Sequence, residues 1–350
     1  MRKKVYFVLS SLNAGGAERV FWLLSQNFDK TLYDVNLVLL NSRAGFFSSE
    51  LKDVRVIDLK TGKASRSFFK LYRLFKKEKP YAVYTTGGHI SALVGLISFF
   101  IPIPHLIARP SNVAEVIRFK GPKSRFLSFF NRLFYNRFDT VVCQSEEIRS
   151  SVRTKYREST RIVIIPNPVI PTDLIKKDAP APEMRKLINV ARLTRQKGHE
   201  RLIRMMAELP AGYRLDIAGD GPLKEEITGQ VRTLNLGDRV KILGLVNGIP
   251  ELLAGYDLMV LPSYVEGFPN VVIESLSVGI PVVAFEVGGI SALIRDGFNG
   301  YIVEQGDLAA FKDRVIRACS RSWDHQAIKD DVATRFSIES IVSDYQELIA

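Results

Sequence analysis

The chain alternates short apolar runs with helix-like stretches, and this alternation constrains its fold more than any other feature. Runs such as DVNLVLL (34–40) and PVVAFE (281–286) lack a regular polar face, which is typical of strands covered on both sides of a parallel sheet. Helix-like segments such as 16–28 and 66–78 separate most of the runs. The pattern therefore predicts an α/β fold built from doubly wound parallel sheets. The predicted strands are 4–10, 34–40, 54–59, 81–86, 105–109, 140–145 and 161–167, followed by 186–192, 213–219, 240–244, 258–263, 281–286 and 300–304.

A proline-rich segment, 166–186, divides the strands into two sets. Proline fixes φ and lacks a backbone donor, so this segment suits neither a helix nor a central strand. With 350 residues the chain is long enough for two cores. We predict two Rossmann-like domains, 1–170 and 171–332, and a C-terminal helix over 333–350 that packs back toward the first domain. Ligands of such sheets bind outside the carboxyl ends of the strands, so the expected site is a cleft between two facing domains.

Positive charge is concentrated in the first half of the chain. The net charge is +12, but residues 1–170 hold 28 Lys and Arg against 12 Asp and Glu, a net charge of +16. Two stretches of that half, 66–79 and 117–138, mix bulky apolar side chains with Lys and Arg. This composition fits an interfacial helix on anionic lipid, and equally a core-facing helix with a solvated basic face. Nucleic acid would also match the charge, but no nucleic-acid motif is present, so it is not expected as a partner.

Membrane spans, metals and cofactors are not expected. The most apolar later segment, 93–104, is well short of the roughly 20 residues that cross a bilayer. The apolar part of the N-terminus, VYFVL, is too short for a signal peptide and fits a first strand. The two cysteines, Cys143 and Cys319, lie far apart without metal-ligand spacing, and there is no Asp-x-Asp sequence.

Two positions in the first half follow predicted strands. In LSSLNAGGAERV, Gly15 and Gly16 form a tight turn before a helix, where backbone amides can approach an anion closely. An ordinary strand–helix turn explains the same residues. His89, in TTGGHIS, also follows a strand, although a single histidine is more often structural.

The second half places charged side chains after three predicted strands. Arg192 and Lys197 follow the strand in NVARLTRQKG, and a guanidinium with an ammonium group suits two linked phosphates, although an exposed basic loop is common. The AGDGP turn (218–222) is explained as well by structure as by ligand contact. In YVEGFPNVVIESL, Glu266 lies in a loop and Glu274 near the start of a helix. Their carboxylates could accept hydrogen bonds from ribose and sugar hydroxyls, while the amides near Phe268–Val271 donate to sugar oxygens.

These motifs, in this order and spacing, resemble the family 4 retaining glycosyltransferases of GT-B fold over nearly the whole chain. The resemblance implies that Arg192 and Lys197 bind the donor diphosphate, that Glu274 binds the ribose and that Glu266 lies beside the transferred sugar. The resemblance also implies the remaining donor contacts: Gly15 and Gly16 at the diphosphate, Gly244 and Leu245 at the base, and Phe268, Pro269, Asn270 and Val271 at the helix start.

The GGAER start, the short chain and the basic first half look like bacterial enzymes that build lipid-linked oligosaccharides or surface polysaccharides. The implied reaction moves a sugar from UDP-GalNAc, UDP-GlcNAc or a UDP-hexose to a polyprenyl-diphosphate-linked saccharide, without metal, at the inner face of the cell membrane. One departure from the family is the acceptor-side histidine: this chain has Arg109 and Pro110 there, so Arg109 and His89 are the acceptor-side candidates. A non-catalytic nucleotide or lipid-diphosphate binding protein is the alternative. A nicotinamide oxidoreductase is disfavoured because the first turn lacks Gly-x-Gly-x-x-Gly.

Overall fold

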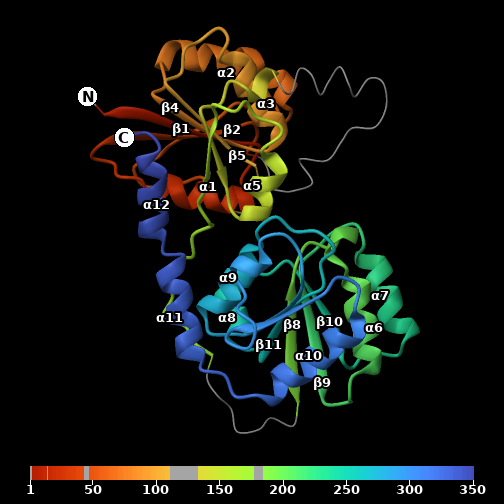
Figure 1. The fold of residues 1–350 in the computed structure, drawn as a ribbon. Helices are drawn as coiled ribbons and strands as arrows, with labels where there is room; N and C mark the ends of the chain where they lie inside the picture. The colour runs from red at the N-terminus through yellow and green to blue at the C-terminus, as the bar shows by residue number, and fades with distance from the viewer. Residues whose placement is uncertain (1, 14, 43–46, 111–132, 177–183) are drawn as a thin grey trace. The chain divides into compact units, whose positions relative to one another are not determined.

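The computed structural model describes all residues except 1, 14, 43–46, 111–132 and 177–183 (Figure 1). The chain divides into two compact units, and each is described by itself. Unit 1 comprises Met1–Pro168 with Ile338–Ala350, and unit 2 comprises Val169–Ser337. The first passage between the units falls inside the proline-rich segment, and the second falls between the last two helices.

Unit 1 is built on a seven-stranded sheet of order β3-β2-β1-β4-β5-β6-β7, in which every described pair is parallel. The prediction of a doubly wound parallel sheet is confirmed for this half, because β1 lies inside the sheet and the later strands extend away from it on both sides. The strands are β1 (Lys3–Leu9), β2 (Tyr33–Leu39), β3 (Arg55–Asp58), β4 (Ala82–Thr86), β5 (His105–Arg109), β6 (Thr140–Cys143) and β7 (Arg161–Ile164).

Helices cover both faces of the unit 1 sheet, which explains why its strands have no polar face. Helices α2 (Ala64–Glu78), α3 (Gly88–Ile97) and α5 (Glu146–Val152) enclose one apolar core. Helices α1 (Gly16–Asn27) and α12 (Ile338–Glu347) enclose the other. The C-terminal helix is tied to this unit by the Tyr84 hydroxyl, which donates to the carbonyl oxygen of Tyr345 at 2.6 Å.

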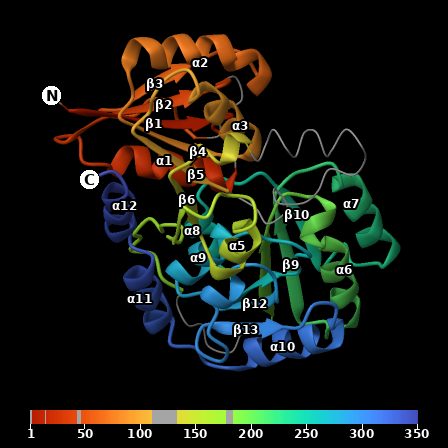
Figure 2. The ribbon, with the colours of Figure 1, turned by 45° about the horizontal axis from the view of Figure 1, so that its top comes forward.

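Unit 2 is built on a six-stranded sheet of order β10-β9-β8-β11-β12-β13, again parallel in every described pair. Helices α6, α7 and α10 cover one face, and α8, α9 and α11 cover the other (Figure 2). The strands are β8 (Arg185–Val190), β9 (Tyr213–Ala218), β10 (Val240–Gly244), β11 (Leu258–Leu261), β12 (Val282–Phe285) and β13 (Gly300–Val303); the helices are α6 (His199–Glu208), α7 (Lys224–Thr233), α8 (Ile249–Leu253), α9 (Asn270–Ser277), α10 (Leu308–Ser320) and α11 (His325–Arg335).

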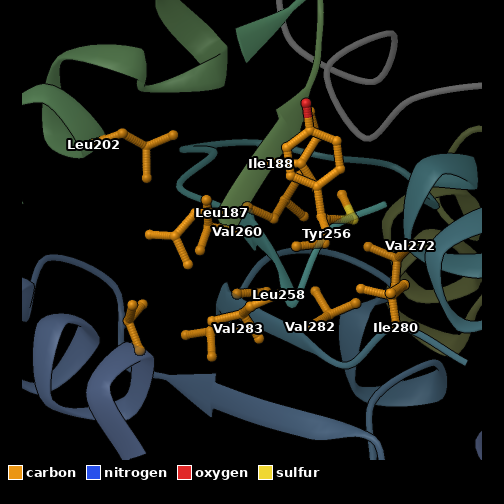
Figure 3. Close-up of a cluster of buried hydrophobic side chains, with 14 of the residues drawn as sticks. Leu187, Ile188, Leu202, Tyr256, Leu258, Val260, Val272, Ile280, Val282 and Val283 are labelled. Carbon is orange, nitrogen blue, oxygen red and sulfur yellow. The ribbon is translucent and has the colours of Figure 1, made fainter. Parts of the chain in front are cut away.

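The core of unit 2 is made largely of the apolar strand residues that predicted it. Leu187, Leu258 and Val282 come from three neighbouring strands and are fully buried (Figure 3). Burial of each such side chain contributes roughly 1.5–3 kcal/mol relative to an exposed one. Because both faces of the central strands are used for packing, polar side chains can reach solvent mainly where the strands end.

The order of strands reverses direction once in each sheet, and this point defines where a ligand is expected. In unit 2 the chain proceeds outward from β8 through β9 to β10, then returns to the other side of β8 with β11. In unit 1 the corresponding point lies between β1 and β4. In open parallel sheets, ligands bind outside the carboxyl ends of the strands at such switch points.

None of the helices among the described residues is both long enough and apolar enough to cross a membrane.

Candidate functional site

The loops that follow β8 and β11 carry the charged side chains of the unit 2 switch point. The Lys197 ammonium lies 2.7 Å from each carboxylate oxygen of Glu266. The Ser263 hydroxyl also donates to Glu266 Oε1, at 2.7 Å. The sequence analysis assigned Lys197 to the donor diphosphate and Glu266 to the transferred sugar, and the structure places these two side chains in direct contact.

This ion pair is largely removed from solvent. The side chains of Lys197 and Glu266 are 19% and 8% exposed, respectively. A carboxylate at that depth needs both a counter-charge and hydrogen bonds, and Lys197 with Ser263 supplies them. The pair is therefore a fixed, partly dehydrated charge cluster at the end of the sheet, where electrostatic interactions with a ligand are stronger than in water.

Gly198 allows the loop after β8 to approach the loop after β11. Its φ is +65°, in the left-handed region that favours glycine, and a Cβ atom there would lie 2.4 Å from the carbonyl oxygen of Pro262. The amide of Tyr264 donates to the carbonyl oxygen of Gln196 at 2.8 Å, closing the same contact. Glycine at position 198 is thus explained by this close backbone contact, in addition to the chemical role expected of Lys197.

Arg201, which the sequence analysis did not select, supports the loop after β11. Its guanidinium donates to the carbonyl oxygen of Pro262 at 3.1 Å and to Gln305 Oε1 at 3.0 Å. The same group lies over two rings, 3.5 Å from the centre of Tyr264 and 4.6 Å from that of Phe285. Stacking of this kind holds the planar guanidinium in one orientation. These partners lie far apart in sequence, so no local pattern could have indicated them.

Arg192 follows β8 and is exposed. Within the described residues its side chain forms neither a hydrogen bond nor an ion pair, so its guanidinium is available to an anion. Glu274 lies in α9 and is 7% exposed. It is the fifth residue of this eight-residue helix and therefore lies in the second turn.

The start of α9 presents backbone amides at the same end of the sheet. Among the residues that the structure describes, no side chain caps this helix, and Pro269 occupies the N-cap position. The first amides of an uncapped helix carry partial positive charge and point away from the helix, which favours anions and oxygen acceptors. Phe268 and Pro269, which precede the helix, are buried, whereas Asn270 and Val271 in its first turn are partly exposed. The start of the helix is therefore held in place by packing and remains accessible to a ligand.

The remaining donor candidate of unit 2 is the end of β10. Gly244 has φ of +74°, and apart from its chain neighbours no described residue has an atom within 4 Å of the place a Cβ would take. Leu245 is 66% exposed. Gly219 lies beside Gly244 in the sheet, and its backbone contacts explain why the AGDGP turn needs glycine there. The Gly219 amide donates to the Gly244 carbonyl at 2.7 Å, and a Cβ on Gly219 would lie 2.0 Å from the Ala191 carbonyl oxygen.

His199 is buried beside this site, with 1% of its surface exposed. Neither ring nitrogen has a hydrogen-bond partner among the described residues. Burial lowers the pKa of His199 to about 4, and the nearby Lys197 charge acts in the same direction while Glu200 opposes it. The imidazole is therefore neutral at pH 7 and serves packing at the start of α6.

In unit 1 the structure joins the segment that follows β1 to the first turn of α3. Ser10 Oγ and His89 Nε2 lie 3.1 Å apart, and Gly15 is the N-cap of α1. His89 is exposed and Gly16 is accessible, so these residues lie at the switch point of their own sheet. Their predicted roles with donor and acceptor stay predictions.

Arg109 lies in the interior of unit 1. It is 2% exposed, and its Nη2 donates to Asn167 Oδ1. The other two guanidinium nitrogens are buried without a partner among the described residues. An acceptor could reach this group only if the surrounding side chains moved. Residues 117–132 of the second basic stretch lie outside the described part of the chain.

Across the described ranges, no group of three or more His, Cys, Asp or Glu side chains is positioned to hold a metal ion. Fold and site together define a protein with two doubly wound units, one of which presents cations, uncapped amides and buried carboxylates at its switch point. Such a combination suits a ligand that contains linked phosphates and sugars.

Comparison with known proteins identifies the class. Residues 172–331 match the family described as "Glycosyl transferases group 1", and residues 15–168 match the "Glycosyl transferase 4-like domain". The lipopolysaccharide core biosynthesis glycosyltransferase LpsE of Rhizobium meliloti is 30% identical over 241 residues, covering 65% of this chain and 69% of the relative. The chain belongs to the family 4 glycosyltransferases of GT-B fold, as the sequence motifs predicted.

One further relative and one solved structure cover almost the full length. A Campylobacter jejuni α-1,4-N-acetyl-D-galactosaminyltransferase, named for a GalNAc-containing saccharide on diphosphoundecaprenol, is 25% identical over 369 residues, 99% of this chain and 98% of the relative. The crystal structure of Anabaena HepE in complex with UDP has a TM-score of 0.78 at 21% identity and covers 99% of this chain and 98% of that one. The structural likeness establishes the fold.

Proposed function

We propose that this glycosyltransferase moves a sugar from a UDP-sugar to a polyprenyl-diphosphate-linked saccharide with retention of anomeric configuration. The observation that carries the proposal is the Lys197–Glu266 pair, buried at the switch point beside the uncapped start of α9. A UDP complex of a protein with this fold supports the nucleotide. The undecaprenol-linked substrate of the Campylobacter relative supports the acceptor class. GalNAc, GlcNAc or a hexose is the proposed sugar.

The proposed donor contacts divide by chemistry. Arg192 and Lys197 bind the diphosphate, and the amides at the start of α9, from Phe268 to Val271, donate to oxygens of the donor. Glu274 accepts hydrogen bonds from the ribose hydroxyls. The backbone of Gly244 and Leu245 receives the base, for which an exposed strand end without a bulky neighbour is suitable.

The proposed reaction needs stabilisation of a leaving diphosphate. The bond from the anomeric carbon to the diphosphate oxygen breaks, and a bond to the acceptor hydroxyl oxygen forms on the same face of the sugar. The hydroxyl proton passes to the departing diphosphate oxygen. Lys197 and Arg192 stabilise the negative charge that develops there, so we propose that no metal ion is required.

Glu266 orients the transferred sugar in this scheme. Lys197 and Ser263 already hold its carboxylate in one position before any ligand binds. A carboxylate held in place loses little freedom when the sugar arrives, which favours accurate placement of the anomeric carbon. His89 is the proposed acceptor-side residue, because it is exposed at the unit 1 switch point, whereas Arg109 is buried. We propose peripheral attachment at the inner face of the cell membrane, because the proposed acceptor is anchored in a lipid bilayer.

The test is a donor and acceptor panel. Purified protein is incubated with UDP- and GDP-sugars and a polyprenyl-diphosphate-linked saccharide, and nucleotide release and product mass are measured. The proposal predicts acceptor-dependent release of UDP and a product heavier by one sugar. Anomeric configuration is then read by NMR. Binding of UDP without turnover of any donor would favour a non-catalytic nucleotide-binding protein and refute the proposal.

A further inference from the structure

Three phenylalanines are exposed on one side of unit 1. Phe69 is 70% exposed, Phe100 is 63% exposed and Phe99 is 46% exposed. Phe69 belongs to α2, while Phe99 and Phe100 belong to the turn that follows α3. Isolated exposed apolar residues are normal on a protein surface, but a contiguous group of large aromatic rings marks an interaction site.

Ring contacts through Phe68 connect Phe69 with Phe100, and Phe99 is the chain neighbour of Phe100. Phe68 lies 5.3 Å from Phe69 and 6.4 Å from Phe100, measured between ring centres. Tyr72 is also 6.4 Å from Phe100. Figures 1 and 2 both show α2 and α3 side by side, with α2 on the outside of unit 1. Two segments that are separated in sequence therefore form one aromatic surface.

The exposed face of α2 beside these rings carries basic side chains and no acidic ones. Residues 64–77 contain no Asp or Glu. The first acidic residue that follows, Glu78, has a side chain only 12% exposed and is paired with Lys4 at 2.7 Å and Arg55 at 3.2 Å. Its charge is thus neutralised inside the unit. The exposed basic residues of α2 are Arg66, Lys70, Arg73, Lys76 and Lys77.

The orientation of α2 is fixed by its opposite face. Ser67, Leu71 and Phe75 are buried against the sheet, so the helix axis lies along the surface of the unit. Phe69 and Lys76 then project outward, seven residues apart, on one side of the helix. No rearrangement of the helix is needed to present aromatic rings and ammonium groups together.

We infer that this aromatic-basic surface, formed by the exposed face of α2 with Phe99 and Phe100, binds an anionic lipid bilayer. Phenylalanine rings partition into the boundary between headgroups and acyl chains, and the cations attract anionic headgroups. A polyanion without apolar or stacking groups would use the cations and leave the rings in water. The inference deepens the proposed function, because a lipid-linked acceptor is held in a membrane, but its test uses no substrate.

The experiment is co-sedimentation of the full chain with vesicles of phosphatidylcholine alone or mixed with phosphatidylglycerol, at low and high salt. Wild type is expected to bind the mixed vesicles, more weakly at high salt because counter-ions screen the attraction. Phe69→Ser/Phe100→Ser and Lys76→Gln/Lys77→Gln are each expected to weaken binding by about tenfold or more. The matched control, Arg232→Gln/Leu234→Ser, removes an exposed cation and an exposed apolar side chain at the end of α7 and should bind like wild type.

Two parallel measurements separate the outcomes. Thermal unfolding verifies that each variant is folded, and UDP binding is measured on every protein. Lost vesicle binding with unchanged UDP affinity supports the inference. Failure of wild type to bind mixed vesicles, or equal binding by the α2 variants, overturns it even if UDP binds. A wild-type dimer in sedimentation equilibrium that the Phe69→Ser/Phe100→Ser variant abolishes, without vesicle binding, would assign the surface to a second copy and also overturn it.

Discussion

The Lys197 ammonium group pairs with Glu266 and, in the proposed function, binds the donor diphosphate. Replacing Lys197 by methionine tests both roles. The substitution keeps the length of the side chain and removes the charge. Glu266, whose side chain is 8% exposed, would then retain only the Ser263 hydroxyl as a side-chain partner among the described residues. Removing one member of a buried ion pair costs about 3–5 kcal/mol, and the 19% exposure of Lys197 reduces that figure through solvent screening. We expect the free energy of unfolding of unit 2 to fall by about 2 kcal/mol.

The double variant Lys197→Met/Glu266→Gln provides the matched control. It removes both charges, so no uncompensated carboxylate remains, and most of the lost stability should return. Catalysis should respond differently. If Lys197 stabilises the leaving diphosphate, the single variant loses about 10²–10³ in kcat, and the double variant does not recover it.

The assays are urea unfolding and steady-state turnover of the donor and acceptor identified by the panel. The proposed role of Lys197 in stabilising the leaving diphosphate is refuted if Lys197→Met retains nearly wild-type kcat. It is also refuted if the double variant restores both stability and turnover, because Lys197 would then act only as a structural partner of Glu266.

Three other residues give independent tests. Glu274→Gln should raise the donor KM by about tenfold with a smaller change in kcat, since a charge-assisted bond to ribose is weakened; an unchanged KM contradicts the ribose assignment. The pKa of His199 is about 4 when folded against 6.5 otherwise, so the unfolded chain binds the extra proton and stability falls by about 1.4 kcal/mol per pH unit from pH 6.5 toward 4. In urea unfolding at several pH values, His199→Leu should lose less stability than wild type between pH 6.5 and 4. Equal losses of stability in the two proteins would exclude the effect. Arg201→Lys loses the stack on Tyr264 and should lower kcat more than it changes donor KM, with Arg201→Ala more impaired; kinetics equal to wild type would show that the loop after β11 needs no such support.

The local pattern of the chain was sufficient to predict its strands. Segments 105–109 and 240–244 coincide with β5 and β10, and the other predicted strands differ from those observed by one to three residues at an end. Strands covered on both faces need continuous apolar character, and that requirement is visible in any short window of sequence. The doubly wound fold follows from the same alternation.

Only the tertiary structure decided which of the candidate side chains meet. Lys197 and Glu266 are 69 residues apart and touch because β8 and β11 are neighbours at the switch point. Arg201 and Gln305 support that contact through a packing arrangement with no local signature. The same applies to Arg109, which lies at a strand end as predicted but is directed into the core of its unit. Periodicity reports which face of an element is apolar, whereas partners across the sheet are chosen by strand order and packing.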